Sequence, residues 1–299
     1  MTQENVSVII PTLNAGSMID DQLTALEHQH RKPDEIIVVD SSSDDNTREI
    51  VKRHPEVRLI VIDRKDFNHG GTRDMALRES KGDFVLFLTQ DAMPADDDYI
   101  SKIIAPLLQN ERVGLVYGRQ LPRPDAKPAE RIVREYSYTS KSFAVTSDDI
   151  QRMGIKAFNA TDVCAAYRRK AYMEVGGFEN PVKTNEDMFI AARLLNAGWY
   201  VVYAADAEVV HSHNFSYQEQ YKRNYIQGYE IERHRDILGD APLTGAGLSM
   251  MVYTVKKLLK NGNGKVKDAA SFVVECGYRY LGNRRGAADA KREQRKAGR

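Results

Sequence analysis

Short apolar runs alternate with amphipathic segments between Val6 and Leu88. Each run is about five residues long, which is too short for a core helix and typical of a strand buried on both faces. The runs lie at Val6–Ile10, Glu35–Asp40, Val57–Ile62 and Phe84–Leu88. The segments between them predict helices, as where Ile19, Leu23 and Leu26 share one helical face. This alternation predicts an α/β fold with a doubly wound, mostly parallel sheet and helices on both faces.

The pattern is less regular from Asp97 onwards. Helices are predicted at Asp97–Leu108, Arg131–Ser142, Lys170–Val175 and Glu186–Ala197. Short strands are predicted at Val113–Gly118, Ala165–Arg169, Trp199–Tyr203 and Ala207–Val210. The Pro-rich, basic residues 119–130 are expected to form a loop, and three helical segments follow near 216–238, 243–260 and 265–281. The chain therefore divides into an α/β domain at 1–215, with halves at 1–118 and 119–215, a helical extension at 216–282, and a basic, disordered tail at 283–299.

Composition narrows the class of protein. Charged residues make up 28% of the sequence and the net charge is +1, so a globular protein without general affinity for nucleic acid is expected. Two cysteines without metal or disulfide spacing, the absence of a signal peptide pattern and the lack of a long apolar run indicate a cytoplasmic protein. The basic C-terminal residues suggest either contact with anionic lipid head groups or a solvated tail.

Polar residues follow three of the predicted strands directly. Pro11, Thr12 and Asn14 follow the first strand, Asp40 ends the second, and Gln90 and Asp91 follow the fourth. Because the carboxyl ends of parallel strands share one edge of the sheet, these residues are expected to meet at a ligand site. Asp40 would accept hydrogen bonds from a ligand such as a pyrimidine ring, or cap the Ser-rich loop that follows it. Asp91 would bind a divalent cation beside a diphosphate, or cap the next helix.

Three further groups of residues could bind a ligand or act in catalysis. Gly70 and Arg73 stand at a helix start, where close backbone approach and the helix dipole favour a phosphate, although paired glycines are also common in turns. Glu186 and Asp187 head another helix as a base and an orienting residue, or simply as helix-capping acids. His211 and His213 lie on one face of the last strand end and are either metal ligands beside Asp91 or plain surface residues.

Two common cofactor classes are disfavoured by the first strand-to-helix turn. Pro11-Thr-Leu-Asn-Ala-Gly16 lacks the Gly-x-Gly-x-x-Gly pattern of dinucleotide-binding proteins, and no P-loop lysine is present. Redox chemistry with a bound dinucleotide and nucleoside triphosphate hydrolysis are therefore not expected.

Five ordered blocks in residues 5–235 resemble the family 2 glycosyltransferases, which have the GT-A fold. The blocks are Ser7–Asn14, Ile37–Thr47, Phe67–Ala76, Gly82–Ala92 and Gly176–Phe178 with Glu186-Asp187. Phe67-Asn-His-Gly-Gly-Thr-Arg73 and Thr89-Gln-Asp-Ala92 are similar to bacterial rhamnosyltransferases of polysaccharide and O-antigen synthesis. The resemblance makes 1–118 the nucleotide-sugar-binding half and 119–215 the acceptor-side half of a catalytic domain.

The resemblance also implies roles for matching residues. Asp40 would contact the pyrimidine, and Pro11, Thr12 and Asn14 would line the same pocket. Thr89-Gln90-Asp91 occupies the family's Asp-x-Asp position, so Thr89 replaces one usual carboxylate and Asp91 would hold Mg²⁺ or Mn²⁺ with other ligands. Asp187 matches the catalytic base. Arg223 and Tyr225 loosely resemble a later block that closes over the diphosphate.

The expected function is thus an inverting, metal-dependent transfer of a sugar. The resemblance favours dTDP-L-rhamnose as donor, with a UDP-sugar as the alternative, and a lipid-linked or polysaccharide acceptor. Peripheral membrane contact and a homo-oligomer through the C-terminal helices are both compatible with the apolar residues after Ser216. A nucleotidyltransferase and a non-catalytic sugar-nucleotide-binding protein remain as alternatives, but the first would need a Gly-rich triphosphate loop that the sequence lacks.

Overall fold

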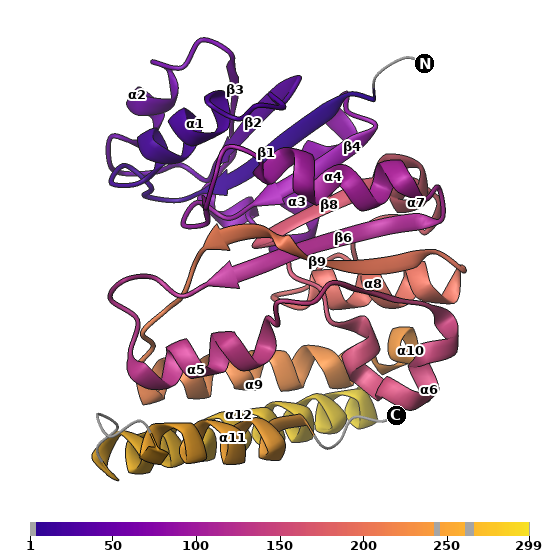
Figure 1. Ribbon diagram of the computed structural model, residues 1–299. Helices are drawn as coiled ribbons and strands as arrows, with labels where there is room; N and C mark the ends of the chain where they lie inside the picture. Colours follow the sequence, from indigo (N-terminus) through magenta and orange to yellow (C-terminus); the bar gives the residue numbers. More distant parts are fainter. Residues whose placement is uncertain (1–3, 242–245, 261–265, 299) are drawn as a thin grey trace.

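A single mixed sheet of nine strands runs through the protein, shown in Figure 1 as a computed structural model that describes residues 4–241, 246–260 and 266–298. The strand order is β3-β2-β1-β4-β8-β6-β9-β5, and β7 also pairs with β9. The strands are β1 (Val6–Thr12), β2 (Glu35–Asp40), β3 (Val57–Val61), β4 (Phe84–Leu88), β5 (Met93–Pro94), β6 (Val113–Leu121), β7 (Phe143–Val145), β8 (Cys164–Arg168) and β9 (Tyr200–Val210).

The predicted parallel half of the sheet is confirmed. β1 pairs in parallel with β2 and β4, and β2 pairs in parallel with β3. Every residue of β4 is buried because helices cover both faces of this region. Alternate residues of β1 and β4 belong to two separate core clusters, one packed on α3 (His69–Glu79) and the other on α1 (Ile19–Glu27) and α4 (Tyr99–Gln109).

The second half of the sheet is mixed and differs from the prediction in three places. β8 pairs antiparallel with both β4 and β6, and β9 runs parallel to β6. A shift in the β6–β9 register after Gly118 lets β6 continue through Leu121, into residues expected to be a loop. The same irregularity makes β9 one continuous strand where two were predicted. The short strand β7 was not predicted, because its three residues are too few to form a recognisable apolar run.

The helices of the α/β part follow the apolar periodicity, with shifted ends. α5 (Pro128–Ser137) starts three residues before the predicted helix because Pro128 fits its first turn, and it ends earlier because the chain turns towards β7. The remaining helices are α2 (Thr47–Val51), α6 (Ile150–Met153), α7 (Arg169–Glu174) and α8 (Glu186–Asn196), with short 3-10 turns at Arg64–Asp66, Ser147–Asp149 and Gly154–Phe158.

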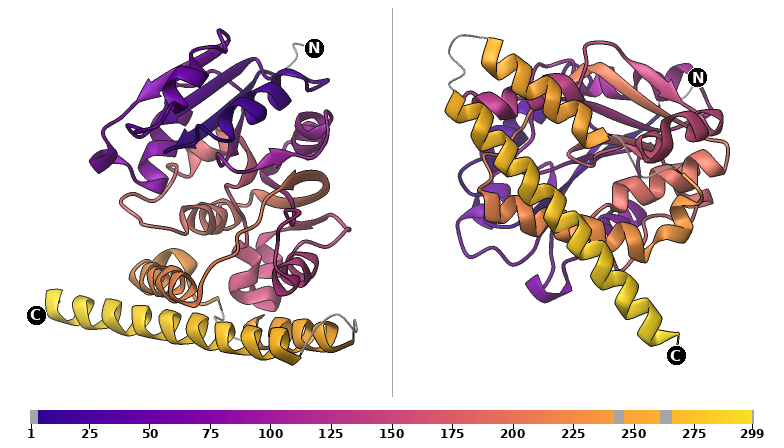
Figure 2. Two further views of the ribbon diagram at one scale, coloured as in Figure 1. Left: turned by 90° about the vertical axis from the view of Figure 1, so that its left-hand side faces the viewer. Right: turned by 90° about the horizontal axis from the view of Figure 1, so that it is seen from below.

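Four helices form the C-terminal region: α9 (Tyr217–Arg233), α10 (Arg235–Leu238), α11 (Ala246–Lys260) and α12 (Val266–Ala297). α11 and α12 lie side by side along one end of the molecule (Figure 2). Parts of the two predicted segments, residues 243–245 and 265, lie outside the described residues. Among the described helices, none combines the length and the apolar character needed to cross a bilayer.

The expectation of a disordered tail at 283–299 is corrected by the structure, in which α12 continues to Ala297. Gly282, Gly286 and Ala290 of α12 are buried against α9. A Cβ atom built on Gly286 would lie 1.9 Å from the carbonyl oxygen of Tyr225, so the two helix backbones are in direct contact. This long-range packing, rather than local sequence, orders the basic segment.

The contact predicts opposite effects for two glycine-to-alanine changes within α12. Gly286→Ala should destabilise the protein by about 1–3 kcal/mol, because the added methyl group must push the helices apart. Gly277→Ala is the matched control, since a Cβ there would meet no atom within 4 Å. It should stabilise α12 by about 0.5–1 kcal/mol. Chemical unfolding measures both changes, and equal effects would contradict the packing argument.

Candidate active site

The ends of β1 and β4 are joined by one side chain. Gln90 accepts a hydrogen bond from the backbone N–H of Leu13 at 2.8 Å and donates one to the Leu13 carbonyl at 3.1 Å. This two-way contact fixes the loop after β1 against the loop after β4. The predicted convergence of strand ends is therefore present, and Gln90 contributes to it as a structural link.

Asp40 is fully buried and has protein partners. Its carboxylate accepts hydrogen bonds from the Ser43 backbone N–H at 2.9 Å, from the Ser43 hydroxyl, and from Thr12 Oγ1 at 3.2 Å. Of the two roles proposed for Asp40, the structure shows the cap of the Ser-rich loop. Asn14 belongs to the same network, because Ser43 Oγ accepts its backbone N–H and its side chain accepts the N–H of Asp44.

A cavity of about 210 Å³ opens at this edge of the sheet. Its walls include four of the predicted site residues, Pro11, Thr12, Gln90 and Arg73. Asp40 and Asn14 are not among its wall residues; Ser41 lines it in their neighbourhood. Gly70 serves packing instead, because a Cβ there would lie 2.4 Å from the carbonyl oxygen of Glu179.

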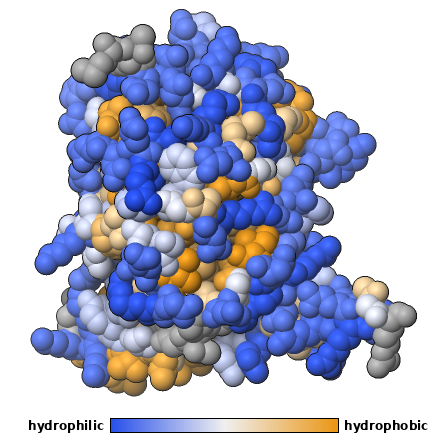
Figure 3. Space-filling model, turned by 90° about the vertical axis from the view of Figure 1, so that its right-hand side faces the viewer, coloured by the Kyte–Doolittle hydropathy of each residue, from blue (hydrophilic) through white to orange (hydrophobic). Residues whose placement is uncertain are grey.

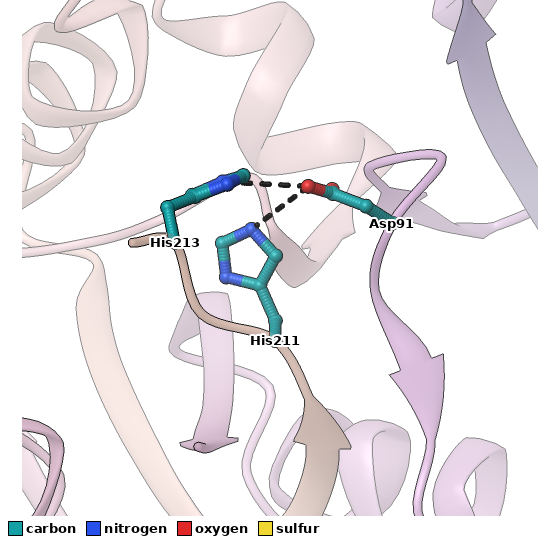
Figure 4. Close-up of side chains that lie close together, drawn as sticks. All are labelled: Asp91, His211 and His213. Atoms are coloured by element: carbon teal, nitrogen blue, oxygen red, sulfur yellow. Dashed lines mark ion pairs between the residues drawn. The ribbon is translucent and has the colours of Figure 1, made fainter. Parts of the chain in front are cut away.

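Asp91, His211 and His213 form a cluster beside this edge (Figure 4). The Nε2 atoms of His211 and His213 lie 3.4 and 3.3 Å from Asp91 Oδ2. Asp91 follows β4 and the histidines follow β9, so residues distant in sequence supply one set of ligand atoms, all within 4.8 Å of one another. The predicted common orientation of the two imidazoles is confirmed, and one carboxylate with two imidazoles fits a divalent transition-metal ion.

Gln120 of β6 orients His211. Gln120 Oε1 lies 2.9 Å from His211 Nδ1 and also accepts a hydrogen bond from Arg134, which has no acceptor of its own. The atom facing His211 is therefore the amide oxygen, and His211 must donate from Nδ1. When Nε2 carries no proton, its lone pair points at the cluster, which is the form that a metal ligand needs.

The charges of the cluster also favour cation binding. Burial raises the pKa of Asp91, but its hydrogen bond and charge interactions with His211 and His213 outweigh burial and hold the pKa well below its usual range. Burial and the neighbouring His211 lower the pKa of His213 to about 4. At neutral pH, Asp91 is thus ionised and His213 keeps a free lone pair.

Arg73 lies between two acids. It is only 4% exposed, and its guanidinium nitrogens lie 3.3 Å from Glu186 Oε1 and 3.6 Å from Asp162 Oδ2. The side chain thus ties α3 to the start of α8 and to the segment before β8. The sequence placed Arg73 at a phosphate, but its ionic partners in the structure are carboxylates.

The second predicted acid, Asp187, is partly buried next to Glu186 at the start of α8. Burial, followed by the charges of Glu186 and Asp162, raises its pKa well above the usual value for an aspartate. Burial also raises the pKa of Asp162 to about 7, against the opposing charge of Arg73. Glu186 pairs with Arg73 while Asp187 does not hold an ion pair among the described residues, so the two adjacent acids have different surroundings, as predicted from their helical positions.

A line of stacked side chains extends from the metal cluster to α9. The Phe215 ring stacks on His213 with centroids 4.7 Å apart, and the Arg223 guanidinium carbon lies 4.5 Å from the Phe215 centroid. This arrangement places a cation near Asp91. Tyr225, which was loosely grouped with Arg223, points elsewhere and donates a hydrogen bond to Asp289 of α12.

Three residues of the site were missed from sequence: Gln120, Asp162 and Arg134. Gln120 lies in the extension of β6 that was expected to be a loop, and Asp162 precedes β8 in an unassigned stretch. Nothing in the local sequence marks Gln120, which is uncharged. Asp162 could have been noticed as an acid directly before an apolar strand.

Comparison with known proteins identifies the family. The family model described as "Glycosyl transferase family 2" matches residues 7–176. The chain is 40% identical to the O-antigen chain rhamnosyltransferase RfbN of Salmonella typhimurium over 75% of this chain and 71% of the relative. It is 38% identical to the O-antigen chain rhamnosyltransferase WbaN of Salmonella anatum over 85% of this chain and 81% of the relative.

Solved structures show the same fold. A mannosyltransferase from Pyrobaculum calidifontis, in complex with GDP-Man and Mn²⁺, matches with a TM-score of 0.64 at 19% identity, covering 97% of this chain and 88% of that one. TarS from S. aureus, residues 1–349, matches with a TM-score of 0.58 at 17% identity, covering 98% and 92%. These matches confirm the expected GT-A fold with a helical C-terminal region. The protein belongs to glycosyltransferase family 2.

Proposed function

We propose that this glycosyltransferase moves L-rhamnose from dTDP-L-rhamnose to a hydroxyl group of a lipid-linked or polysaccharide acceptor, with inversion at the anomeric carbon. The sugar and the glycan class are suggested by the two Salmonella relatives, which are O-antigen chain rhamnosyltransferases. The observation that carries the proposal is the arrangement of the site: the cavity is bordered by Thr89 and Gln90, next to the metal cluster, and by Arg73, which pairs with Glu186.

The cavity at the ends of β1 and β4 is the proposed donor site. Pro11, Thr12 and Ser41 would line the pyrimidine, and the buried Asp40, bonded to Ser43 and Thr12, would hold the loop behind this wall in place. Asn14 holds the loop that shapes this wall. The adjacent cluster would then lie at the diphosphate.

Asp91, His211 and His213 would hold the metal ion. Two imidazole nitrogens fit Mn²⁺ better than Mg²⁺, which prefers oxygen ligands. When bound, the ion would neutralise charge on the departing diphosphate. Arg223, near Asp91, would act on the same charge, whereas Arg73 is engaged by Glu186 and Asp162 and would instead position the acids.

Asp187 is the proposed general base. It would take the proton of the acceptor hydroxyl while that oxygen forms a bond to the anomeric carbon and the bond from that carbon to the diphosphate oxygen breaks. The raised pKa of Asp187 suits this role, because a base with higher proton affinity removes a hydroxyl proton more readily. Glu186, fixed by Arg73, would keep the start of α8 in place.

Release of nucleoside diphosphate from a panel of sugar nucleotides tests the donor and the metal together. Release from dTDP-L-rhamnose should require both Mn²⁺ and a glycan acceptor. Asp91→Asn should weaken calorimetric donor binding in the presence of Mn²⁺ by about tenfold or more, because a charged ligand is lost. Asp206→Asn, an exposed carboxylate on β9, is the control. Release from a UDP-sugar instead would refute dTDP-L-rhamnose as the donor. Donor binding that does not depend on Mn²⁺ would refute the metal-binding role of the cluster.

Asp187→Asn tests the base. The variant should keep donor affinity but lose about 10²–10⁴-fold in kcat, the usual contribution of a general base. In the wild type, the acid limb of the kcat/KM profile should lie above the range of an ordinary aspartate, since the raised pKa leaves Asp187 protonated and inactive at low pH. Turnover close to that of the wild type in Asp187→Asn would exclude this assignment.

The outer face of α11 and α12 is proposed to rest on an anionic membrane surface. Exposed apolar residues follow helical spacing on both helices: Leu248, Val252 and Leu259 on α11, and Val266, Val273, Tyr280 and Leu281 on α12. An apolar patch is visible at the lower edge of Figure 3 over this region. Lys256, Lys260 and Lys267 are exposed beside them, which suits anionic lipid head groups better than a second copy of the same basic face.

Flotation with vesicles containing phosphatidylglycerol tests this contact. The protein should float with these vesicles at low salt. Leu259→Glu should bind about tenfold more weakly, because it removes a leucine side chain that would be buried in the membrane surface. Leu108→Glu on α4 is the control, since Leu108 is 55% exposed and Leu259 is 52% exposed. Absence of flotation, with a dimer in size-exclusion chromatography that Leu259→Glu disrupts, would assign the face to a homo-oligomer instead.

A further inference from the structure

A second cavity lies outside the site described above. It has a volume of about 490 Å³ and lies where the first turns of α5, α9 and α12 meet, at the lower left of Figure 1. It is larger than the cavity at the strand ends, and two of its three walls belong to the helical region that follows the family match at residues 7–176.

The walls of this cavity combine aromatic rings with carboxylates. Phe215, Tyr217 and Phe272 supply the rings, and Asp268, Glu275 and Lys127 supply the charges. Tyr217 is held in place because its ring stacks on Tyr278 at 5.4 Å and its hydroxyl lies 2.6 Å from Ser271 Oγ. A fixed aromatic face is thus available without rearrangement.

The two carboxylates differ in their partners. Glu275 accepts hydrogen bonds from Gln220 and Arg279, so its position is fixed. Asp268 makes no side-chain hydrogen bond or ion pair to any of the residues that the structure describes, and it lines the cavity. The cavity therefore presents at least one carboxylate that is free to accept hydrogen bonds from a ligand.

The cavity also adjoins the metal cluster through one residue. Phe215 forms part of the cavity wall, and its ring stacks on His213, one of the two histidines that face Asp91. A chain-like ligand that occupies the cavity thus lies one side chain away from the cluster.

These features favour a neutral carbohydrate. The apolar C–H face of a sugar ring packs against aromatic rings, and its hydroxyl groups donate to carboxylates. A diphosphate would meet two acids and a single lysine, and a lipid tail would leave the carboxylate of Asp268 without a polar partner.

We propose that this cavity binds a neutral sugar residue of the acceptor chain, remote from the hydroxyl group that is glycosylated. The inference rests on the proposed transferase function. It makes α12 part of acceptor recognition, so that acceptors long enough to reach the cavity bind more tightly than short ones.

Binding of neutral methyl glycosides, including methyl α-L-rhamnoside, to the full chain can be followed by saturation-transfer NMR without donor. Wild-type protein should give a signal with at least one glycoside. Asp268→Trp, which fills the cavity, should abolish the signal, and Asp268→Ala should weaken binding about tenfold because a charged acceptor is removed. Asp240→Ala is the control; it removes an exposed carboxylate beyond α10, at the opposite end of α9.

Kinetics with rhamnose-containing oligosaccharides of increasing length provide a second measurement. Asp268→Ala should raise KM for the longer acceptors about tenfold and leave KM for the shortest acceptor near the wild-type value. Thermal unfolding verifies that both Asp268 variants are folded.

Two results would overturn the subsite: no glycoside signal in the wild type, or a signal that persists in Asp268→Trp. Either result leaves donor-dependent nucleoside diphosphate release intact. Loss of that release in the wild type with every donor would instead refute the proposed transferase reaction, so the two failures are distinguishable.

Discussion

The buried ion pairs of Arg73 hold the two halves of the protein together at the site. Arg73 comes from the parallel half, Asp162 precedes β8 in the mixed half, and Glu186 starts α8. Burying one cation among three acids, including Asp187, is costly unless the charges are paired, and the raised pKa values of Asp162 and Asp187 reflect that cost. The same arrangement raises the proton affinity of Asp187, the proposed base, so one network would serve both the fold and the proposed chemistry.

The cluster of Asp91, His211 and His213 is the proposed answer to a missing carboxylate. Thr89 stands where the family pattern has an acid, and Gln90 between them is used to join β1 to β4. His211 and His213, which follow β9, place two imidazole nitrogens beside Asp91 instead. With one carboxylate in place of two, the cluster carries less negative charge and therefore attracts a nearby cation such as Arg223 less strongly.

The pattern of apolar residues along the sequence predicted the strands of the parallel half, but not the contacts between distant residues. β1 to β4 were recognisable because buried parallel strands are continuously apolar, and their polar ends met as the topology requires. The partners of Arg73, the hydrogen bond of Gln120 to His211 and the packing of Gly286 on Tyr225 join residues far apart in sequence. Asp40 shows a different difficulty: one carboxylate at a strand end can cap a loop or face a ligand, and only the loop geometry shows which donors reach it.

The close contact between α9 and α12 helps to define which elements of this protein unfold together. α9 is also bonded to the loop before α8, because Asn185 donates to the Gln227 carbonyl and the Lys183 N–H donates to Glu230. The acids at the start of α8 are thus anchored to a helix that lies beyond the predicted boundary at residue 215. We infer that α9 unfolds together with the α/β part. A chain cut at residue 215 would then retain every strand of the sheet and still lose the rigidity of its acidic site.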